Sequence, residues 1–439
     1  MAAQLYKTES GRLWHAGAIA IVTVGLPARG KTHTSRSLLR YLRWLGVRTE
    51  VFHLGNYRRK DIKQELSYDF FDPGKDFLSN KETSDLRRLI AEKVLDDLVE
   101  FFQSGGQVGI YDASNTTAER RQRILERLSQ AGAHVVFIES ICDRPDIVEQ
   151  NIRAVKISHP DYVSWNKEEA LKDFQRRINN HLPYYEPLSE KHLSWVKMIN
   201  VGERMIVNNV NGFLPSRIVY YLMNLHITPR TIYLARNGRS TNEDNDKEDP
   251  GLSPEGFEHA KHLEVFMRQL RESRQESSGE WPATTERLNV WTSARRRSYE
   301  TAKHFEGLPN VKTRRRPMLR EINMGEFDEM TRAQIKAQHP EEWERHLKQP
   351  YRHRYPCAES YHDLAVRLEP MILELEREKN DVLIIAHRSV LRCFYAYMFG
   401  LPEQEIPDLT IARNCLLEIT PGAYTYRERR WTIPGTDQS

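Results

Sequence analysis

The amino-acid sequence predicts an α/β protein of two domains, each built on a mostly parallel sheet with flanking helices. The chain has 439 residues, which exceeds the roughly 250–300 residues that a single hydrophobic core usually supports. Short runs rich in β-branched residues alternate with longer amphipathic stretches between Ala18 and Met223, and the alternation begins again at Thr231. Because parallel strands need crossover connections, this alternation favours parallel sheets covered by helices.

The predicted elements follow one another in a regular order. In the first half we expect strands at 18–24, 49–55, 107–112 and 134–140, and helices at 33–46, about 83–102, from 117, from 145 and at 215–226. Pro229 follows the last of these, so we place the junction there and predict domains at residues 1–229 and 230–439. In the second half we expect strands at 231–235, 288–293 and 381–387, helices from 254, 294 and 388, and polar loops at 241–250 and 271–286.

The composition limits the classes of function. Lys and Arg exceed Asp and Glu by only four and are scattered, which disfavours nucleic acid as a partner and fits small anionic ligands. The four cysteines lie far apart without a C-x-x-C pair, which disfavours a disulfide framework or a zinc site. The longest apolar run is far short of the roughly 20 residues of a membrane helix, and the N-terminus lacks an apolar signal core. We therefore expect a cytoplasmic protein that binds no membrane.

The segment after the first strand matches a phosphate-binding pattern. GLPARGKT fits G-x-x-x-x-G-K-[ST], with an apolar strand before it and an amphipathic helix after it. In this context backbone N–H groups face the phosphates, the lysine neutralises the β and γ oxygens, and the threonine hydroxyl holds Mg²⁺. The alternative is a glycine-rich turn followed by a surface lysine. We assign ATP binding to Gly25, Leu26, Pro27, Ala28, Arg29, Gly30, Lys31 and Thr32.

Charged residues follow several other predicted strands. Asp112 ends the apolar run QVGIYD and is the natural acidic ligand for Mg²⁺. A strand-terminal aspartate can instead cap a helix, but the following ASNTT already offers capping hydroxyls, and the two roles are compatible. Arginine pairs at 58–59, 87–88, 120–121 and 176–177 are each typical of a solvated helix face. Several of them at one sheet edge would instead hold a phosphorylated substrate.

Longer stretches of the chain resemble one enzyme family. GLPARGKT, RYLRWLGV, GNYRR, YDASNTTAERR, FIESICDRPDIVEQNIRAVKISHPDY, DFQRRI and SRIVYYLMNLHITPRTIYLARNG are together similar to the bifunctional 6-phosphofructo-2-kinase/fructose-2,6-bisphosphatases. The similarity runs from about Ala18 to Thr425 and is densest in the kinase half. It implies a P-loop kinase domain followed by a histidine-phosphatase domain of the phosphoglycerate-mutase-like fold. It also implies ATP, Mg²⁺ and fructose 6-phosphate as ligands, and a homodimer.

The resemblance implies roles for individual residues. Lys31, Thr32 and Asp112 would handle MgATP, and residues from Asn151 to Lys156 would line the nucleotide, with Lys156 steadying the transferred phosphate. The kinase-site cysteine of the family falls on Cys142. Fructose 6-phosphate would lie against Arg58, Arg87, Ser114, Arg120, Arg177 and His181. The family usually has Thr at position 114 and Tyr at position 181, and the histidine could weaken sugar-phosphate binding or make it depend on pH.

The second predicted domain departs from its family at the nucleophile. In histidine phosphatases the first strand ends in L-x-R-H-G-E, and the histidine takes up the phosphoryl group. This chain reads LARNGR, with Asn237 at the histidine position and Arg239 in place of the acidic residue. The lone pair of an amide nitrogen is delocalised into the carbonyl, so asparagine is not a competent nucleophile. We therefore predict that bisphosphatase turnover is lost or very low.

Other parts of that site match the family. The phosphate-pocket arginines, the proton donor, the second histidine and a substrate arginine fall on Arg236, Arg297, Glu321, His387 and Arg392. Cys357 replaces the usual lysine, Arg388 replaces the usual glutamine, and the glycine-rich loop after residue 237 is missing. The remaining arginines should still attract anions. The stretch RRRS, which ends at Ser298, resembles a phosphorylation site but falls on a predicted helix, which favours a structural role.

Three functions follow from these observations. We expect a kinase that phosphorylates the C2 hydroxyl of fructose 6-phosphate, essentially without the opposing bisphosphatase activity, and so raises fructose 2,6-bisphosphate, a regulator of glycolysis in this family. One alternative is a bifunctional enzyme in which His387 or water replaces the nucleophile. The other is a non-catalytic sensor of phosphorylated metabolites. A nucleic-acid translocase is disfavoured, because the chain lacks a basic stripe and stacking aromatics.

Overall fold

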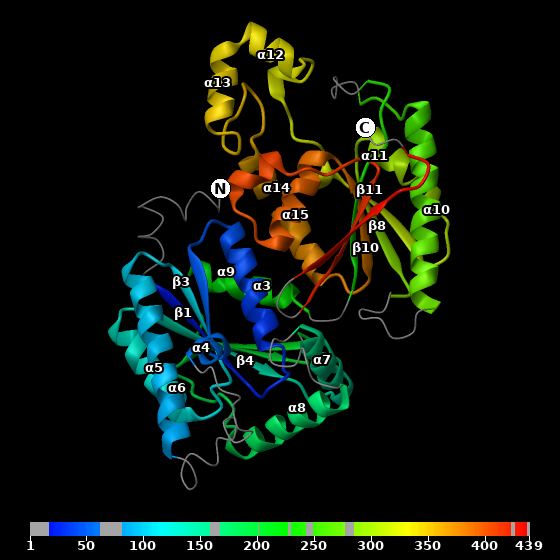
Figure 1. Cartoon of the computed structure of the whole chain (residues 1–439). Helices are drawn as coiled ribbons and strands as arrows, with labels where there is room; N and C mark the ends of the chain where they lie inside the picture. Colours follow the sequence, from blue (N-terminus) through cyan, green and yellow to red (C-terminus); the bar gives the residue numbers. More distant parts are fainter. Residues whose placement is uncertain are drawn as a thin grey trace. The chain divides into compact units, whose positions relative to one another are not determined.

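The computed structural model describes residues 17–61, 81–158, 167–200, 202–226, 230–242, 249–276, 285–422 and 426–436. The chain forms two compact units that meet in the sequence between residues 227 and 228. Most of the predicted junction lies outside the described residues, so the boundary at residue 229 stays a prediction. Both units are α/β (Figure 1), which confirms the predicted fold class.

The described strands of the first unit form a six-stranded sheet in the order β2-β3-β1-β4-β5-β6. Neighbouring strands are parallel, except that β6 runs antiparallel to β5. Every residue of β1 and β3 is buried, because central parallel strands are covered on both faces. The strands are β1 (Ile19–Val24), β2 (Thr49–His53), β3 (Val108–Asp112), β4 (His134–Ile141), β5 (Ser194–Ile199) and β6 (Arg204–Asn208).

Helices cover both faces of this sheet (Figure 1). On one face, α3 (Lys31–Trp44) packs against α9 (Phe213–Asn224), and the rings of Tyr41 and Tyr221 stack with their centroids 4.3 Å apart. On the other face, α5 (Lys81–Gln103) and α6 (Ala118–Gln130) share an apolar core with the strands. The helices α4 (Leu54–Asp61) and α7 (Pro145–Ser158) follow the carboxyl ends of β2 and β4, and α8 (Lys167–His181) packs against α7.

The described strands of the second unit form another six-stranded sheet, in the order β12-β11-β7-β10-β8-β9. The strands β7, β10, β8 and β9 are parallel, whereas β11 and β12 are antiparallel additions at one edge. The carboxyl ends of β7, β10 and β8 therefore lie side by side. The strands are β7 (Ile232–Arg236), β8 (Leu288–Ser293), β9 (Val311–Arg316), β10 (Asp381–Ala386), β11 (Cys415–Thr420) and β12 (Arg427–Thr432).

Helices also cover both faces of the second sheet (Figure 1). They are α10 (Pro254–Glu276) and α11 (Arg296–Thr301) on one face, and α14 (Tyr361–Arg377) and α15 (Arg388–Phe399) on the other. A smaller apolar cluster forms around α12 (Arg332–Gln338) and α13 (Pro340–Lys348). Among the described helices, none combines the length and the apolar character that a membrane span needs.

One loop prediction was wrong. The helix α10 continues through residues 271–276, which we assigned to a polar loop. Two charged residues of this last stretch face inward, where Arg271 binds the buried Asp381 at 2.7 Å and Arg274 binds the buried Glu418. Burying a carboxylate without a partner is costly, so these pairs favour the helix at a place where the polar composition suggested solvent.

Candidate active sites

The carboxyl end of β1 carries the candidate phosphate-binding loop. Gly25, Ala28 and Gly30 have φ angles of 137°, 59° and 82°, which let the chain turn from β1 into α3. A Cβ atom on Gly25 would lie 2.5 Å from the carbonyl oxygen of Ser140 on β4. Only glycine fits there, because it combines a positive φ angle with this close approach. The loop is therefore packed tightly against the neighbouring strand.

Lys31 begins α3 and is 9% exposed. Its Nζ atom donates a hydrogen bond to the carbonyl oxygen of Leu26 across the loop, at 2.7 Å. Burial lowers the pKa of Lys31 to about 8, although the nearby Asp112 carboxylate opposes the shift. The ammonium group thus lies inside the loop whose N–H groups would receive phosphates.

Asp112 ends β3, the strand beside β1, and its side chain is 2% exposed. Its Oδ1 atom lies 3.3 Å from the hydroxyl of Thr23, and its Oδ2 atom lies 3.1 Å from Nδ1 of His53. Burial acts to raise the pKa of Asp112, but His53, Lys31 and a hydrogen bond from Thr32 outweigh it and hold the pKa below its usual value. Asp112 is therefore an ionised carboxylate. Asp112 is not the cap of α6, because the N-cap of that helix is Thr117, whose side chain accepts a hydrogen bond from the Arg120 N–H.

The donor set of Thr32 and Asp112 fits Mg²⁺. This ion usually takes one or two carboxylates and completes its shell with waters and substrate phosphates. The buried Asp112 carboxylate has one close neighbour at each oxygen, Thr23 at Oδ1 and His53 at Oδ2, and each carboxylate oxygen can accept more than one interaction. An ionised carboxylate with that remaining capacity, beside the Thr32 hydroxyl and the phosphate loop, is suited to a cation.

Two asparagines connect the loop to other elements. Asn151 of α7 donates from Nδ2 to the carbonyl oxygen of Ala28 at 3.0 Å, so it touches the phosphate loop. Asn115 donates to the carbonyl oxygen of Thr23 at 2.8 Å and accepts from Arg120 Nε at 3.0 Å. Asn115 was absent from the predicted site, although its place three residues after a strand-terminal aspartate is a signal that could have found it. It ties the predicted substrate residue Arg120 to β1.

The remaining predicted kinase residues are distributed over several elements. Cys142 follows β4 and is 6% exposed, and burial raises the pKa of its thiol, so it stays protonated near neutral pH. The side chain of Lys156, on α7, lies outside the described residues. The carbonyl oxygen of Ser114 accepts a hydrogen bond from the Gly25 N–H at 2.9 Å. Arg58 of α4 is buried. Arg87 of α5 is half-buried, as are Arg177 and His181 of α8.

Asn237 follows β7 in the second unit and is 6% exposed. Its backbone N–H donates to the carbonyl oxygen of Ala386 on β10 at 3.2 Å, and its Nδ2 atom donates to the carbonyl oxygen of Gly238 at 2.9 Å. The N–H of Gly238 donates to Thr301 Oγ1 on α11 at 2.9 Å. Hydrogen bonds of residues 237 and 238 therefore fix the end of β7. The buried side chain at this position is the amide of Asn237.

His387 follows β10 at the same edge and is 1% exposed. Arg297 approaches its Nδ1 atom with two guanidinium nitrogens, at 3.3 and 3.2 Å, and the hydroxyl of Ser298 lies 3.4 Å from Nε2. Glu321 Oε2 lies 3.7 Å from Nδ1 of His387 and 4.0 Å from Arg297. The structure thus brings three of the predicted residues together. Ser298 is fully buried, in keeping with a structural role.

The other two predicted arginines are held by main-chain oxygens. Arg236, at the end of β7, donates to the carbonyl oxygen of Ile411 at 3.4 Å. Arg392 of α15 donates to the carbonyl oxygen of Leu409 at 2.6 Å and to the hydroxyl of Tyr361 at 2.8 Å. The segment 409–411 therefore orients both guanidinium groups.

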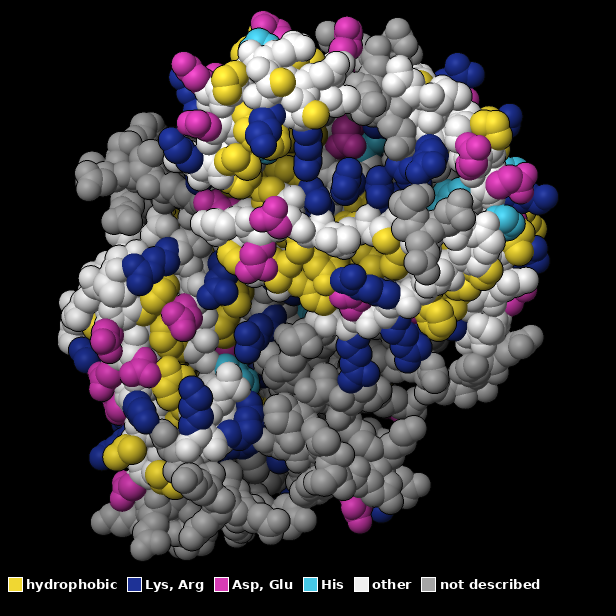
Figure 2. Space-filling view, turned by 45° about the horizontal axis from the view of Figure 1, so that its top comes forward, with side chains coloured by type: hydrophobic (Ala, Val, Ile, Leu, Met, Phe, Trp, Pro, Cys, Tyr) yellow, Lys and Arg dark blue, Asp and Glu magenta, His cyan; other side chains and the backbone are white. Residues whose placement is uncertain are grey.

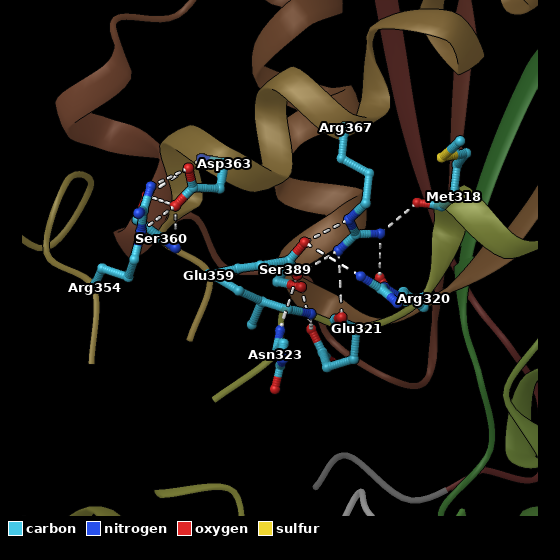
Figure 3. A network of polar contacts seen from close by, with 11 residues as sticks. Met318, Arg320, Glu321, Asn323, Arg354, Glu359, Ser360, Asp363, Arg367 and Ser389 are labelled. Atoms are coloured by element: carbon cyan, nitrogen blue, oxygen red, sulfur yellow. Dashed lines mark hydrogen bonds and ion pairs between the residues drawn. The ribbon is translucent and has the colours of Figure 1, made fainter. Parts of the chain in front are cut away.

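Arg367 of α14 holds the segment that carries Glu321 (Figure 3). It donates to both carboxylate oxygens of Glu359, at 2.8 and 2.9 Å. It also donates at 2.6, 3.1 and 3.3 Å to the main-chain carbonyl oxygens of Met318, Arg320 and Glu321. Glu321 itself accepts from the hydroxyl of Ser389. We did not predict Arg367, since its contacts depend on how α14 packs.

The rim of this second site is basic. Arg239, Arg295 and Arg388 follow the carboxyl ends of β7, β8 and β10. Arg239 and Arg388 are exposed, and Arg295 is half-buried. Figure 2 shows Lys and Arg side chains gathered on the visible face of the second unit. Clustered cations of this kind attract anionic ligands. Cys357, which stands where the family usually has a lysine, adds no charge; it is exposed and has a φ angle of 59°.

Comparisons with known proteins cover nearly the whole chain. A family model described as 6-phosphofructo-2-kinase matches residues 6–229, and a model of the histidine phosphatase superfamily (branch 1) matches residues 232–434. The chain is 42% identical to 6-phosphofructo-2-kinase/fructose-2,6-bisphosphatase 3 of Rattus norvegicus over 93% of this chain and 70% of the relative. It is also 42% identical to form 4 of Rattus norvegicus (92% of this chain, 82% of the relative) and to form 1 of Mus musculus (93% and 83%).

Proposed function

Because this chain belongs to the 6-phosphofructo-2-kinase/fructose-2,6-bisphosphatase family, we propose that its first unit makes fructose 2,6-bisphosphate and that its second unit hydrolyses the product very slowly or not at all. In the first unit the γ-phosphate of ATP is transferred to the C2 hydroxyl of fructose 6-phosphate. The observation that carries the kinase is the placement of two buried charged residues at one edge of the sheet, with Lys31 after the phosphate loop that follows β1 and Asp112 at the end of the neighbouring strand β3.

The kinase residues act by position and charge. Phosphoryl transfer needs alignment and neutralisation of charge more than covalent help from the protein. The backbone N–H groups of residues 28–30 and the start of α3 cradle the phosphates, and Lys31 neutralises their oxygens. Thr32 and Asp112 hold Mg²⁺, which when bound neutralises charge on the β and γ phosphates. Asn151 and Lys156 line the nucleotide.

The acceptor site rests on the arginines around the same sheet edge. We assign the sugar phosphate to Arg58, Arg87, Ser114, Arg120, Arg177 and His181. Arg120 is the best supported of these, because Asn115 fixes its guanidinium to β1, the strand that leads into the phosphate loop. Bidentate guanidinium contacts suit a phosphate better than single ammonium charges do. Cys142 lines this region as a neutral thiol.

Loss of hydrolysis is supported by the chemistry at the end of β7. Covalent catalysis here needs a nitrogen nucleophile with an available lone pair, and the lone pair of the Asn237 amide nitrogen is delocalised into its carbonyl group. Arg236, Arg297 and Arg392 remain at the site, so we propose that the pocket still binds phosphate groups. General acid and electrostatic groups without the nucleophile leave only a residual rate.

Phosphorus NMR of the full chain with MgATP and fructose 6-phosphate tests both parts of the proposal. We expect an acid-labile C2 phosphate that persists after ATP is exhausted, and no product with Lys31→Ala. Decay of the product to fructose 6-phosphate and phosphate at a rate comparable to its formation would overturn the loss of hydrolysis. If the wild-type chain made no product, the kinase assignment would fail, and a metabolite sensor would explain the fold better.

A further inference from the structure

His53 is a half-buried titratable side chain to which the proposed function assigns no role. It ends β2, and the parallel register pairs it with Asp112 at the end of β3. Side chains at paired positions of neighbouring strands point to the same face of a sheet. The imidazole therefore meets the carboxylate, with Nδ1 3.1 Å from Oδ2 and side chains that are 14% and 2% exposed.

Both partners of this contact are held from other sides. A Cβ atom on residue 55 would lie 2.9 Å from Nε2 of His53, so Gly55 leaves room for the ring at the start of α4. Thr23 lies 3.3 Å from Oδ1 of Asp112. One carboxylate oxygen thus faces the threonine hydroxyl and the other faces the imidazole, and the two neighbours together set the orientation of the carboxylate.

We propose that His53 is a positioning residue that orients Asp112 for the magnesium–nucleotide complex. The inference rests on the proposed kinase function, in which Asp112 holds Mg²⁺. Groups that contact a metal ligand from behind fix its orientation, and removing them typically lowers metal affinity about 10–100-fold. His53 acts through Asp112 and needs no contact with the substrate.

A merely structural role for His53 makes a different prediction. If the imidazole only joined β2 to β3, its loss would weaken the sheet edge and reduce nucleotide binding equally with and without magnesium. If it orients Asp112, its loss raises the magnesium concentration that nucleotide binding needs and leaves metal-free binding alone. The magnesium dependence of nucleotide binding therefore separates the two roles without relying on turnover.

The test uses three variants of the full chain, His53→Asn, His53→Gln and His53→Leu. The Asn side chain can place its amide nitrogen near the position of Nδ1, whereas Gln places it near Nε2 and Leu fills the volume without a donor. Binding of a non-hydrolysable ATP analogue is measured by titration calorimetry across a magnesium series and in EDTA. We expect Gln and Leu to raise the magnesium midpoint about tenfold and to leave the affinity in EDTA within about twofold. Asn should stay near the wild-type midpoint.

Three other results would overturn the inference. An unchanged midpoint in Gln and Leu would show that Asp112 needs no orienting partner, while the kinase assignment stands. An equal loss of affinity with and without magnesium would assign His53 to the structure of the sheet edge. If His53→Leu does not fold, the Asn and Gln pair gives the same decision. If the wild-type chain shows no magnesium-dependent binding, the proposed kinase function fails and the inference fails with it.

Discussion

The guanidinium of Arg297 lies against the Nδ1 atom of His387, with Nε at 3.3 Å and Nη2 at 3.2 Å. A guanidinium can only donate, so Nδ1 accepts and the ring proton lies on Nε2. The Ser298 hydroxyl lies 3.4 Å from that second nitrogen. Both ring nitrogens are therefore engaged, which argues against His387 as a replacement for the missing nucleophile.

We expect Asn237→His to increase hydrolysis of fructose 2,6-bisphosphate by at least about tenfold. The substitution places an imidazole at the end of β7, at the sheet edge that also carries Arg297 and Arg236, whose guanidinium groups we expect to bind the transferred phosphate. The gain is limited because Arg239 stays where the family has an acidic residue. Phosphate release and acid-labile labelling of the protein measure the effect. Asn237→Gln keeps an amide and should match the wild-type rate; equal rates in the two variants would contradict the assignment of position 237.

Gly25→Ala should abolish nucleotide binding, because a methyl group would lie 2.5 Å from the carbonyl oxygen of Ser140 and force the phosphate loop away from β4. Gly132 is the matched control. It also has a positive φ angle, of 76°, but a Cβ atom there meets nothing within 4 Å. Gly132→Ala should cost about 1 kcal/mol of stability and leave binding unchanged. Calorimetric titration with ATP measures the difference. Normal binding by Gly25→Ala would show that the loop can move away from Ser140 at no cost.

The central strands could be predicted from the sequence, and several edge strands could not. Buried parallel strands such as β1 and β10 read as continuous apolar runs, so their composition identifies them. The edge strands β9 and β12 carry VKTRRR and RERRWT, contain no buried residue, and have a polar composition that resembles that of loops. Their pairing with β8 and β11 comes from the tertiary arrangement, which a local pattern does not contain.

The candidate sites divide in the same way. Residues that belong to a motif or end an apolar strand, such as Lys31, Asp112 and Asn237, could be named from the sequence because position along the chain defines them. His53 and Arg367 could not, since their importance depends on which strand or helix lies beside them. The pairing of β2 with β3 brings His53 to Asp112, and the packing of α14 brings Arg367 to the Glu321 segment.

His259 should make the second unit less stable in mild acid. It is 5% exposed on α10, with Nε2 3.4 Å from the carbonyl oxygen of Arg236, and burial lowers its pKa from 6.5 to about 4. Because the folded-state pKa is the lower one, the unfolded chain binds more protons between pH 6.5 and 4, and stability falls as the pH decreases through this window. The loss attributable to His259 between pH 7 and pH 5 is about 2 kcal/mol.

Urea unfolding of the second unit at the two pH values measures this effect. His259→Gln removes the titrating group, so its unfolding free energy should change less with pH by about that amount. His304 is exposed, and His304→Gln should retain the wild-type pH dependence. An unaltered pH dependence in His259→Gln would mean that this histidine does not titrate in the window.

Arg367→Met should loosen the segment that carries Glu321. The substitution removes hydrogen bonds to three main-chain carbonyl oxygens and leaves Glu359, which is 17% exposed, without its bidentate partner. Glu359 also accepts from the N–H of Asn323 at 3.0 Å, so the main chain beyond Glu321 depends on the same carboxylate. We expect a local loss of about 2 kcal/mol.

Hydrogen exchange of the peptide 318–327 measures this local stability. A loss of about 2 kcal/mol corresponds to about thirtyfold faster exchange of protected amides. Arg354→Met is the control, because it breaks another Arg–carboxylate pair at the start of α14 (Figure 3), in which Arg354 is 54% exposed. Exposed pairs contribute less than about 1 kcal/mol, so exchange at 318–327 should stay near wild type. Equal exchange in the two variants would mean that the Glu321 segment is held by its own turn geometry and by Ser389, and that Arg367 does not position it.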